Sequence, residues 1–168
     1  MAAIQLEYAA FSRDIEGPDG THLLATCREL GVSIIAYSPL GRGQLTANFV
    51  SEPTATDMRA QIFPRFAGEA REKNVQLVRE FKALADKKGC STAQLAIAWL
   101  LKQGDDIIPI PGTKKIKYLE ENWAALKVEL TDEEEKQIRE FVEKSEVAGG
   151  LIPPGMEEYR FASTAAEA

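Results

Sequence analysis

The sequence has 168 residues, of which 45% are hydrophobic and 8% aromatic, a composition typical of one globular domain and not of a disordered or fibrous chain. Its 20 basic and 26 acidic residues leave a net charge of -6, which argues against binding nucleic acid or anionic membranes through bulk charge. No apolar run is long enough to span a bilayer, and Cys27 and Cys90 have neither metal-ligand nor redox spacing. We therefore expect free thiols and a soluble, cytoplasmic protein.

The first part of the chain predicts a strand, a helix and a second strand. Residues 4–8 have a strand pattern, and apolar residues at helical spacing indicate a helix over 23–30 that ends at Gly31. The compact apolar run over 32–37 is typical of a buried strand, and Ser38-Pro39 ends it. Because the first strand begins almost at Met1 without a leading turn, we expect a fold that is entered part-way through.

The middle of the chain predicts a long connection, two helices and a short strand. Residues 40–71 show little periodicity, which indicates a functional or mobile loop. Helices are predicted over 75–88 and 91–103 from their apolar stripes. A strand is predicted over 107–110, where Pro109 implies a special or disrupted position in the ladder.

Two amphipathic helices complete the pattern. We expect the second to open with a capping box formed by Thr131 and Glu134, and both tryptophans to be core residues on helical stripes. The tail from Gly149 is expected to be loose. The residues that mark the first of these helices are Ile116, Leu119, Trp123 and Leu126.

This alternation of strands and helices predicts an α/β fold with parallel strands, because each parallel return needs a crossover. Only about three strands are visible, whereas a closed barrel typically needs about eight. Partners or further sequence would have to cover the exposed sheet edges.

The segment from Ile107 to Asn122 is the strongest candidate for a binding site. It combines an apolar strand, a turn containing Gly112 and Thr113, and a helix start followed by lysines. Helix N-termini attract phosphate through unpaired N–H groups, and Thr113 would cap the helix. An ordinary capped helix with a solvated basic face is the alternative, and this segment alone favours that alternative.

A second segment, residues 36–45, has similar character. Tyr37 ends a strand and is followed by Ser38, a glycine turn and Arg42, so the ring would stack on a planar cofactor and the turn would meet a pyrophosphate. A core tyrosine above a glycine turn is supported equally well. Gly41-Arg-Gly43 is not the dinucleotide-binding glycine fingerprint.

In this order, and with Gln5, the two segments resemble the ends of the sixth, seventh and eighth strands in the C-terminal half of the aldo-keto reductases. Pro64-Arg-Phe66 and the run from Gly112 to Tyr118 look most like the fungal branch near the pyridoxal reductases. The resemblance extends over nearly the whole chain. The matching stretches are Gln5-Leu-Glu-Tyr8, Ala36-Tyr-Ser-Pro-Leu-Gly-Arg-Gly43, Ile110-Pro-Gly-Thr-Lys114 and Leu119-Glu-Glu-Asn122.

The resemblance implies the C-terminal part of a TIM (β/α)8 barrel, with a partial NADP-dependent domain over residues 1–148 and a tail over 149–168. It also implies reduction of aldehydes or ketones with NADP(H). Tyr118 departs from the family, because many members have Arg there; Lys117 would compensate. By resemblance, Gln5 holds the nicotinamide carboxamide, Tyr37 stacks on its ring, Ser38, Pro39, Leu40 and Arg42 line the pyrophosphate, Gly112, Thr113 and Lys114 meet the 2'-phosphate, and Glu121 and Asn122 face the adenine.

The family's chemistry requires a tyrosine acid assisted by Lys, Asp and His on earlier strands, which this sequence does not contain. We therefore expect a truncated chain that is inactive alone, with no catalytic or metal-binding residue assigned. His22 is expected to be a surface or partly packed residue without a role. The loop over 40–71 would close over the cofactor or be disordered in isolation, and disorder is favoured. The alternative function is a non-catalytic assembly protein that binds a complementary barrel half or itself.

Overall fold

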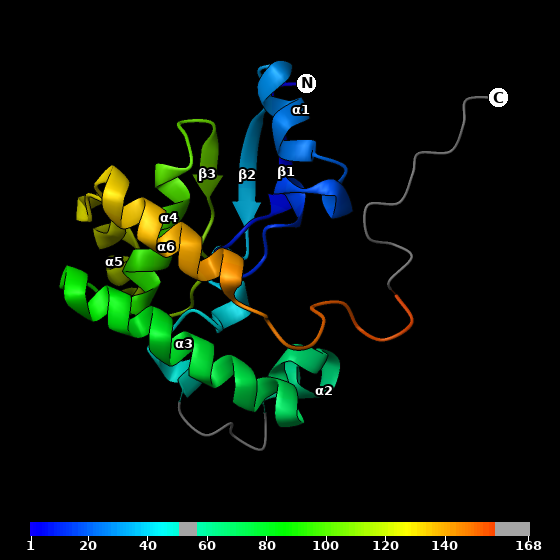
Figure 1. The fold of residues 1–168 in the computed structure, drawn as a ribbon, viewed down its shortest axis with the longest axis vertical. Helices are drawn as coiled ribbons and strands as arrows, with labels where there is room; N and C mark the ends of the chain where they lie inside the picture. The colour runs from blue at the N-terminus through cyan, green and yellow to red at the C-terminus, as the bar shows by residue number, and fades with distance from the viewer. Residues whose placement is uncertain (51–56, 157–168) are drawn as a thin grey trace.

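The sheet at the centre of the molecule contains three parallel strands (Figure 1). The computed structural model describes residues 1–50 and 57–156. Strands β1 (Ala3–Glu7), β2 (Ser33–Tyr37) and β3 (Ile107–Pro109) lie in that order, with Gln5 opposite Ile35 in the register. The predicted α/β fold with parallel pairing is confirmed. Within the described residues the sheet stays open.

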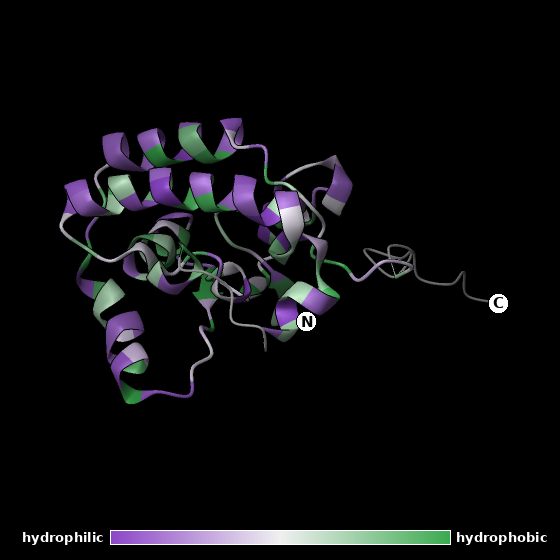
Figure 2. Cartoon of the chain, turned by 90° about the horizontal axis from the view of Figure 1, so that it is seen from below, coloured by the Kyte–Doolittle hydropathy of each residue, from purple (hydrophilic) through white to green (hydrophobic). Residues whose placement is uncertain are grey.

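Six α-helices accompany the sheet in the described part of the chain. Figure 2 shows hydrophilic and hydrophobic residues alternating along the long helices, as expected of amphipathic helices that cover a core. The predicted capping box of Thr131 and Glu134 opens the last helix. The helices are α1 (Leu23–Glu29), α2 (Met58–Ile62), α3 (Gly68–Lys88), α4 (Thr92–Lys102), α5 (Ile116–Ala124) and α6 (Asp132–Lys144).

The connection from residue 40 to α3 contains more structure than its sequence indicates. Helix α3 begins at Gly68, seven residues before the predicted start at Val75. The sequence pattern missed its first two turns because they are mostly polar and carry no apolar stripe. Phe49 and Phe66 are buried before it, with ring centroids 5.7 Å apart in an edge-to-face contact. The expectation of disorder is therefore wrong for residues 40–50 and 57–71, while 51–56 lie outside the described residues.

The two faces of the sheet differ in cover. Along β2, Ile34 and Ala36 are fully buried, whereas Ile35 and Tyr37 are only partly covered. Behind the buried face, Trp99 of α4 packs edge-to-face on Tyr8, with ring centroids 5.9 Å apart. Helices thus seal one face of the sheet and leave the other accessible.

Pro109 occupies a position in β3 that tolerates proline. The backbone N–H of Ile110 donates to the carbonyl of Ala36 at 3.0 Å, so alternate residues of β3 face β2. Pro109 lies between two such residues and its nitrogen faces the open edge, where no ladder hydrogen bond is lost.

Helix α5 presents an uncovered apolar stripe. Trp123 is 71% exposed, so its predicted core position is wrong, whereas Trp99 is fully buried as predicted. The spacing of apolar residues identifies the apolar side of a helix, but no described element packs on that side of α5. The stripe comprises Ile116, Leu119 and Trp123 of α5 and continues to Leu126 in the 3-10 turn that follows, Ala125–Lys127.

Hydrogen bonds tie the segment after α6 to the rest of the fold as far as Gly150. The side chain of fully buried Asn74 donates to the carbonyls of Arg65 and Ala148 and accepts from the Ala148 N–H. The Arg65 N–H donates to the carbonyl of Gly150 at 3.3 Å. The chain is therefore attached to the fold as far as Leu151, which is partly buried against the core, where a loose tail from Gly149 was expected; residues 154–156 are exposed. Among the described residues, no helix has the length and apolar character required to cross a bilayer.

Candidate functional site

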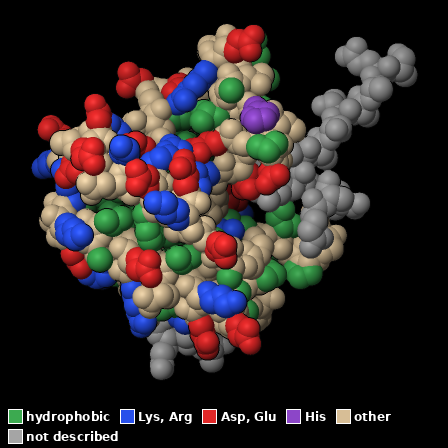
Figure 3. All heavy atoms as spheres, in the orientation of Figure 1, with side chains coloured by type: hydrophobic (Ala, Val, Ile, Leu, Met, Phe, Trp, Pro, Cys, Tyr) green, Lys and Arg blue, Asp and Glu red, His purple; other side chains and the backbone are tan. Residues whose placement is uncertain are grey.

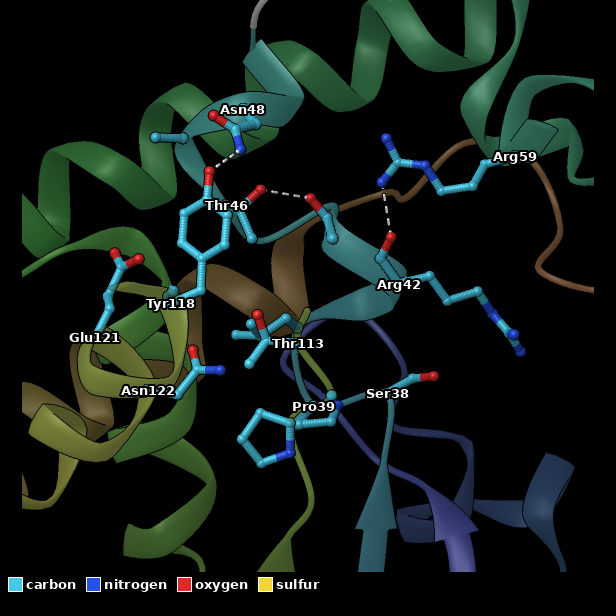
Figure 4. Close-up of a pocket in the computed structure, with 16 residues that line it drawn as sticks. Ser38, Pro39, Arg42, Thr46, Asn48, Arg59, Thr113, Tyr118, Glu121 and Asn122 are labelled. Carbon is cyan, nitrogen blue, oxygen red and sulfur yellow. Dashed lines mark hydrogen bonds between the residues drawn. The ribbon is translucent and has the colours of Figure 1, made fainter. Parts of the chain in front are cut away.

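A cavity of about 470 Å³ lies where the turn after β2 meets the turn after β3 and the start of α5 (Figure 4). The two turns meet because parallel neighbouring strands end at the same edge of the sheet. Eight residues singled out in the sequence line this cavity: Ser38, Pro39, Leu40, Arg42, Gly112, Thr113, Glu121 and Asn122.

The turn after β2 is held in a strained backbone conformation. Ser38 and Arg42 have φ values of 50° and 55°, in the left-handed region that non-glycine residues rarely adopt. The N–H of Gly41 donates to the carbonyl of Ser38 at 2.8 Å and fixes the turn. Strain of this kind costs on the order of 1–3 kcal/mol per residue and is concentrated at binding sites.

The start of α5 differs from the expectation. Lys115 is the N-cap residue and no side chain caps the helix, so the predicted capping role of Thr113 is wrong. Instead, the Thr113 hydroxyl oxygen accepts a hydrogen bond from the Lys115 N–H at 3.2 Å, which stabilises the turn before the helix. The helix begins two residues later than capping by Thr113 requires.

The lysines at this helix start lie outside the cavity. Neither Lys114 nor Lys117 lines it. The ammonium of Lys117 lies 4.7 Å from the ring centroid of Tyr118, a cation–π contact. Any interaction of these lysines with a ligand would therefore take place at the rim of the cavity.

A hydrogen bond joins the two walls of the cavity. The Asn48 side-chain amide, from the segment after β2, donates to the Tyr118 hydroxyl of α5 at 2.9 Å (Figure 4). This hydrogen bond is the main cause of a lowered pKa for Tyr118, to which Lys117 adds. Tyr118 thus connects α5 to the opposite wall of the cavity.

A second cavity of about 480 Å³ contains Gln5 and Tyr37. Its walls include Phe11 and Arg65 and the segment after α6. Arg42 lines both cavities, so the two adjoin at this residue. The twelve residues predicted from the sequence are therefore divided: eight line the first cavity, Gln5 and Tyr37 line the second together with Arg42, and Lys114 and Lys117 line neither.

The Arg42 side chain points away from the first cavity (Figure 4). It donates to the carboxylate of Glu7 at 3.2 Å in a contact between one nitrogen and one oxygen. The remaining oxygen of Glu7 and the Nε of Arg42 are buried without a partner. In the first cavity Arg42 therefore contributes backbone, and its charge lies toward the second cavity.

Sequence patterns did not identify Arg59, which enters the first cavity from α2 (Figure 4). Its guanidinium is paired with Asp57, the N-cap residue of α2. The spacing of an N-cap Asp and an Arg two residues later is a weak signal that would have marked the pair as a local unit, but not as part of a site.

The remaining candidates lie apart from both cavities. His22, the only histidine of the sequence, is exposed at the N-cap of α1, where Figure 3 shows it on the surface among charges of both signs. Within the described residues, no group of three or more His, Cys, Asp or Glu side chains is arranged to hold a metal ion.

Comparisons with known proteins agree with this architecture. Residues 1–143 match the model of the aldo/keto reductase family. The chain is 45% identical over 157 residues to aldo-keto reductase yakc [NADP(+)] of Schizosaccharomyces pombe, covering 92% of this chain and 46% of that protein. It is 46% identical over 153 residues to aldo-keto reductase str7 of Strobilurus tenacellus, covering 89% and 44% respectively. The chain thus spans about half the length of these curated relatives.

Solved structures show the same partial coverage. A glycerol dehydrogenase from Gluconobacter oxydans superimposes with a TM-score of 0.67 at 28% identity, covering 90% of this chain and 45% of that one. A thermostable aldo-keto reductase solved with epalrestat gives a TM-score of 0.57 at 26% identity, covering 83% and 39%. The open three-stranded sheet is part of a TIM (β/α)8 barrel. The chain belongs to the aldo/keto reductase family.

Proposed function

We propose that the chain is the NADP(H)-binding C-terminal portion of an oxidoreductase that reduces aldehydes or ketones to alcohols. The observation that carries the proposal is the pair of adjoining cavities that meet at Arg42. A dinucleotide consists of two nucleotide halves joined by a diphosphate, and each cavity has a volume in the range of ligand pockets, about 300–1,000 Å³.

The residues of the second cavity suit the nicotinamide half. Tyr37 offers an aromatic face for stacking, and Gln5 offers an amide that both donates and accepts hydrogen bonds. Both residues end or lie on strands, which hold them more rigidly than loops would. The bound cofactor would supply the hydride that reduces the carbonyl carbon.

The residues of the first cavity suit the adenosine half. The turn around Gly112 and Thr113 and the uncapped start of α5 provide hydrogen-bond donors, and Asn122 and Glu121 provide amide and carboxylate groups for the base. Lys114 and Lys117, at the rim, would meet a 2'-phosphate, which would favour NADP over NAD. The name of the Schizosaccharomyces pombe relative includes NADP(+), which supports this preference.

We further propose that the isolated chain binds the cofactor without turnover. Carbonyl reduction needs a proton donor matched to hydride arrival. Within the described residues, neither His nor Lys lines either cavity, so neither is in place to assist a tyrosine acid. NADPH-dependent aldehyde reduction by the purified chain at ordinary enzyme rates would contradict this proposal.

The binding proposal is tested by titrating the purified chain with NADPH and with NADH and following cofactor fluorescence. We expect saturable binding, tighter for NADPH, and a Lys114→Ala variant that loses the difference. Lys87→Ala, which removes an exposed lysine of α3 that lines neither cavity, is the matched control. No saturable binding at millimolar concentrations would refute the retained site.

The second candidate function is assembly through α5. Its exposed stripe carries Trp123 and three further apolar side chains, and exposed apolar surface of this kind marks interaction sites. We propose that the partner is a polypeptide corresponding to the half of the relatives that this chain does not span. Mixing the chain with that half of the Schizosaccharomyces pombe relative should give a complex on size-exclusion chromatography, and Trp123→Glu should abolish it. Failure of the unsubstituted chain to form the complex would refute this assignment.

A further inference from the structure

The positive charge available inside the first cavity comes from one side chain. Among the described residues that line it, the cationic side chains are Arg42 and Arg59. The Arg42 guanidinium points toward Glu7 and the second cavity, whereas the Arg59 guanidinium points into the first (Figure 4). A phosphate inside this cavity would therefore meet Arg59, while the lysines at the start of α5 remain at the rim.

Arg59 is held in place from three sides. Its Nε and Nη2 donate to the two carboxylate oxygens of Asp57, at 2.9 and 2.8 Å. Its Nη1 donates to the backbone carbonyl of Arg42 at 2.8 Å, and its guanidinium lies 5.0 Å from the ring centroid of Phe66. A forked pair with a carboxylate and stacking on an aromatic ring restrict the guanidinium before any ligand arrives.

Two of its N–H groups are free to bind a ligand. A guanidinium carries five N–H donors, and the three hydrogen bonds of Arg59 described above engage one on each of its three nitrogens. One donor therefore remains on each of Nη1 and Nη2. Both remaining donors lie in the guanidinium plane, which the contacts of Arg59 fix, and can bind the oxygens of a phosphate.

The turn after β2 is built to admit this guanidinium. A Cβ at Gly43 would lie 2.7 Å from Nη1 of Arg59, closer than real Cβ contacts permit. Gly43 also has a φ of +90°, a conformation that other residues rarely adopt. Because Gly43 has no side chain, the Arg59 guanidinium can lie against the turn after β2, which the family resemblance assigns to the pyrophosphate.

We propose that Arg59 binds the diphosphate of the dinucleotide and that Asp57 is its positioning residue. This inference rests on the proposed cofactor-binding function and adds a residue that neither the sequence motifs nor the lysines at the start of α5 supply. The Asp57–Arg59 pair carries no net charge, so Arg59 acts through directed hydrogen bonds more than through long-range attraction.

The experiment compares the affinities of NADPH and NADH for the full chain and for Arg59→Ala, Arg59→Lys and Asp57→Asn. Both cofactors contain the diphosphate and only NADPH contains the 2'-phosphate. Arg59→Ala should weaken both by the same factor, about tenfold or more, so their ratio stays constant. Arg59→Lys, which keeps the charge and loses the fork, should fall between, as should Asp57→Asn. Arg79→Ala, at an exposed position of α3, should bind as the unsubstituted chain does.

The outcomes separate this inference from the proposed function. Unchanged binding of both cofactors by Arg59→Ala would overturn the role of Arg59 while leaving the cofactor site intact. A loss confined to NADPH would place Arg59 at the 2'-phosphate and overturn the assignment to the diphosphate. If the unsubstituted chain binds neither cofactor, the proposed function fails and this inference fails with it. Circular dichroism checks folding, and Arg59→Lys decides the question if Arg59→Ala does not fold.

Discussion

Replacing Asn74 by Ala should loosen the segment that walls the second cavity. Asn74 is fully buried in α3, and its side chain makes hydrogen bonds of 3.0 and 2.8 Å to the carbonyls of Arg65 and Ala148 and one of 2.9 Å from the Ala148 N–H. The substitution removes all three hydrogen bonds from partly buried backbone groups. Each unpaired buried group costs about 1–3 kcal/mol, but Arg65 and Ala148 are only half-buried and water can reach them. We therefore expect a loss of about 2–4 kcal/mol in the free energy of unfolding.

Urea unfolding of the two proteins, followed by circular dichroism, measures this loss. Gln76→Ala, at an exposed position two residues further along α3, is the matched control and should change stability by less than about 0.5 kcal/mol. Because the segment after Ala148 lines the cavity that contains Tyr37, the same substitution should weaken NADPH more than adenosine 2',5'-bisphosphate, which lacks the nicotinamide half. A loss below about 0.5 kcal/mol for Asn74→Ala would refute the view that these hydrogen bonds secure the segment.

Three further predictions concern the first cavity and the charge pair at the other end of the sheet. Tyr118→Phe loses the hydrogen bond between the cavity walls, so NADPH should dissociate faster in stopped-flow fluorescence, and an unchanged rate would contradict a closing role. Gly43→Ala should displace the Arg59 guanidinium and weaken NADPH and NADH alike in the same titration; unaltered affinities would mean that the turn tolerates a Cβ. Hydrogen bonding from Arg28 holds the pKa of Asp106 below its usual value, so the stabilisation is present at neutral pH and lost as pH falls through the lowered pKa. Asp106→Asn should therefore be less stable than the unsubstituted chain at pH about 7, and this gap, measured by urea unfolding, should narrow as the pH falls below about 4. A gap that does not change with pH would argue against the ion pair.

The strands and most helices could be predicted from the sequence because their signals are local. The alternation of burial in β2 and the capping box of Thr131 follow from a few neighbouring residues. The first two turns of α3, from Gly68, were missed because their residues are mostly polar, so no apolar stripe marks them. Trp123 was misplaced for a different reason: periodicity shows where apolar side chains gather on a helix but not whether another element covers them.

The site could be predicted where its residues are contiguous. Ser38 to Arg42 and Gly112 to Thr113 each form one turn, and the parallel sheet brings the two turns together. Arg59 and Asn48 were missed because they reach the cavity through the packing of the connection after β2, which has no periodic signal. The Thr113 hydroxyl accepts a hydrogen bond from the Lys115 N–H in the turn before α5 and does not cap the helix. Helix α5 therefore starts two residues later than capping by Thr113 would require.

The open edge of β3 has an asymmetry that bears on assembly. Residues 107 and 109 of this strand face away from β2; the Ile107 N–H donates to the carbonyl of Gly104 at 3.1 Å, and Pro109 has no N–H. Along β3, this edge thus offers carbonyl acceptors and no spare donor. Two copies of β3 set edge to edge would present acceptors to acceptors, so they cannot form a ladder. A strand that arrives with its own N–H groups free can pair there, so this edge fits a strand other than a second copy of β3.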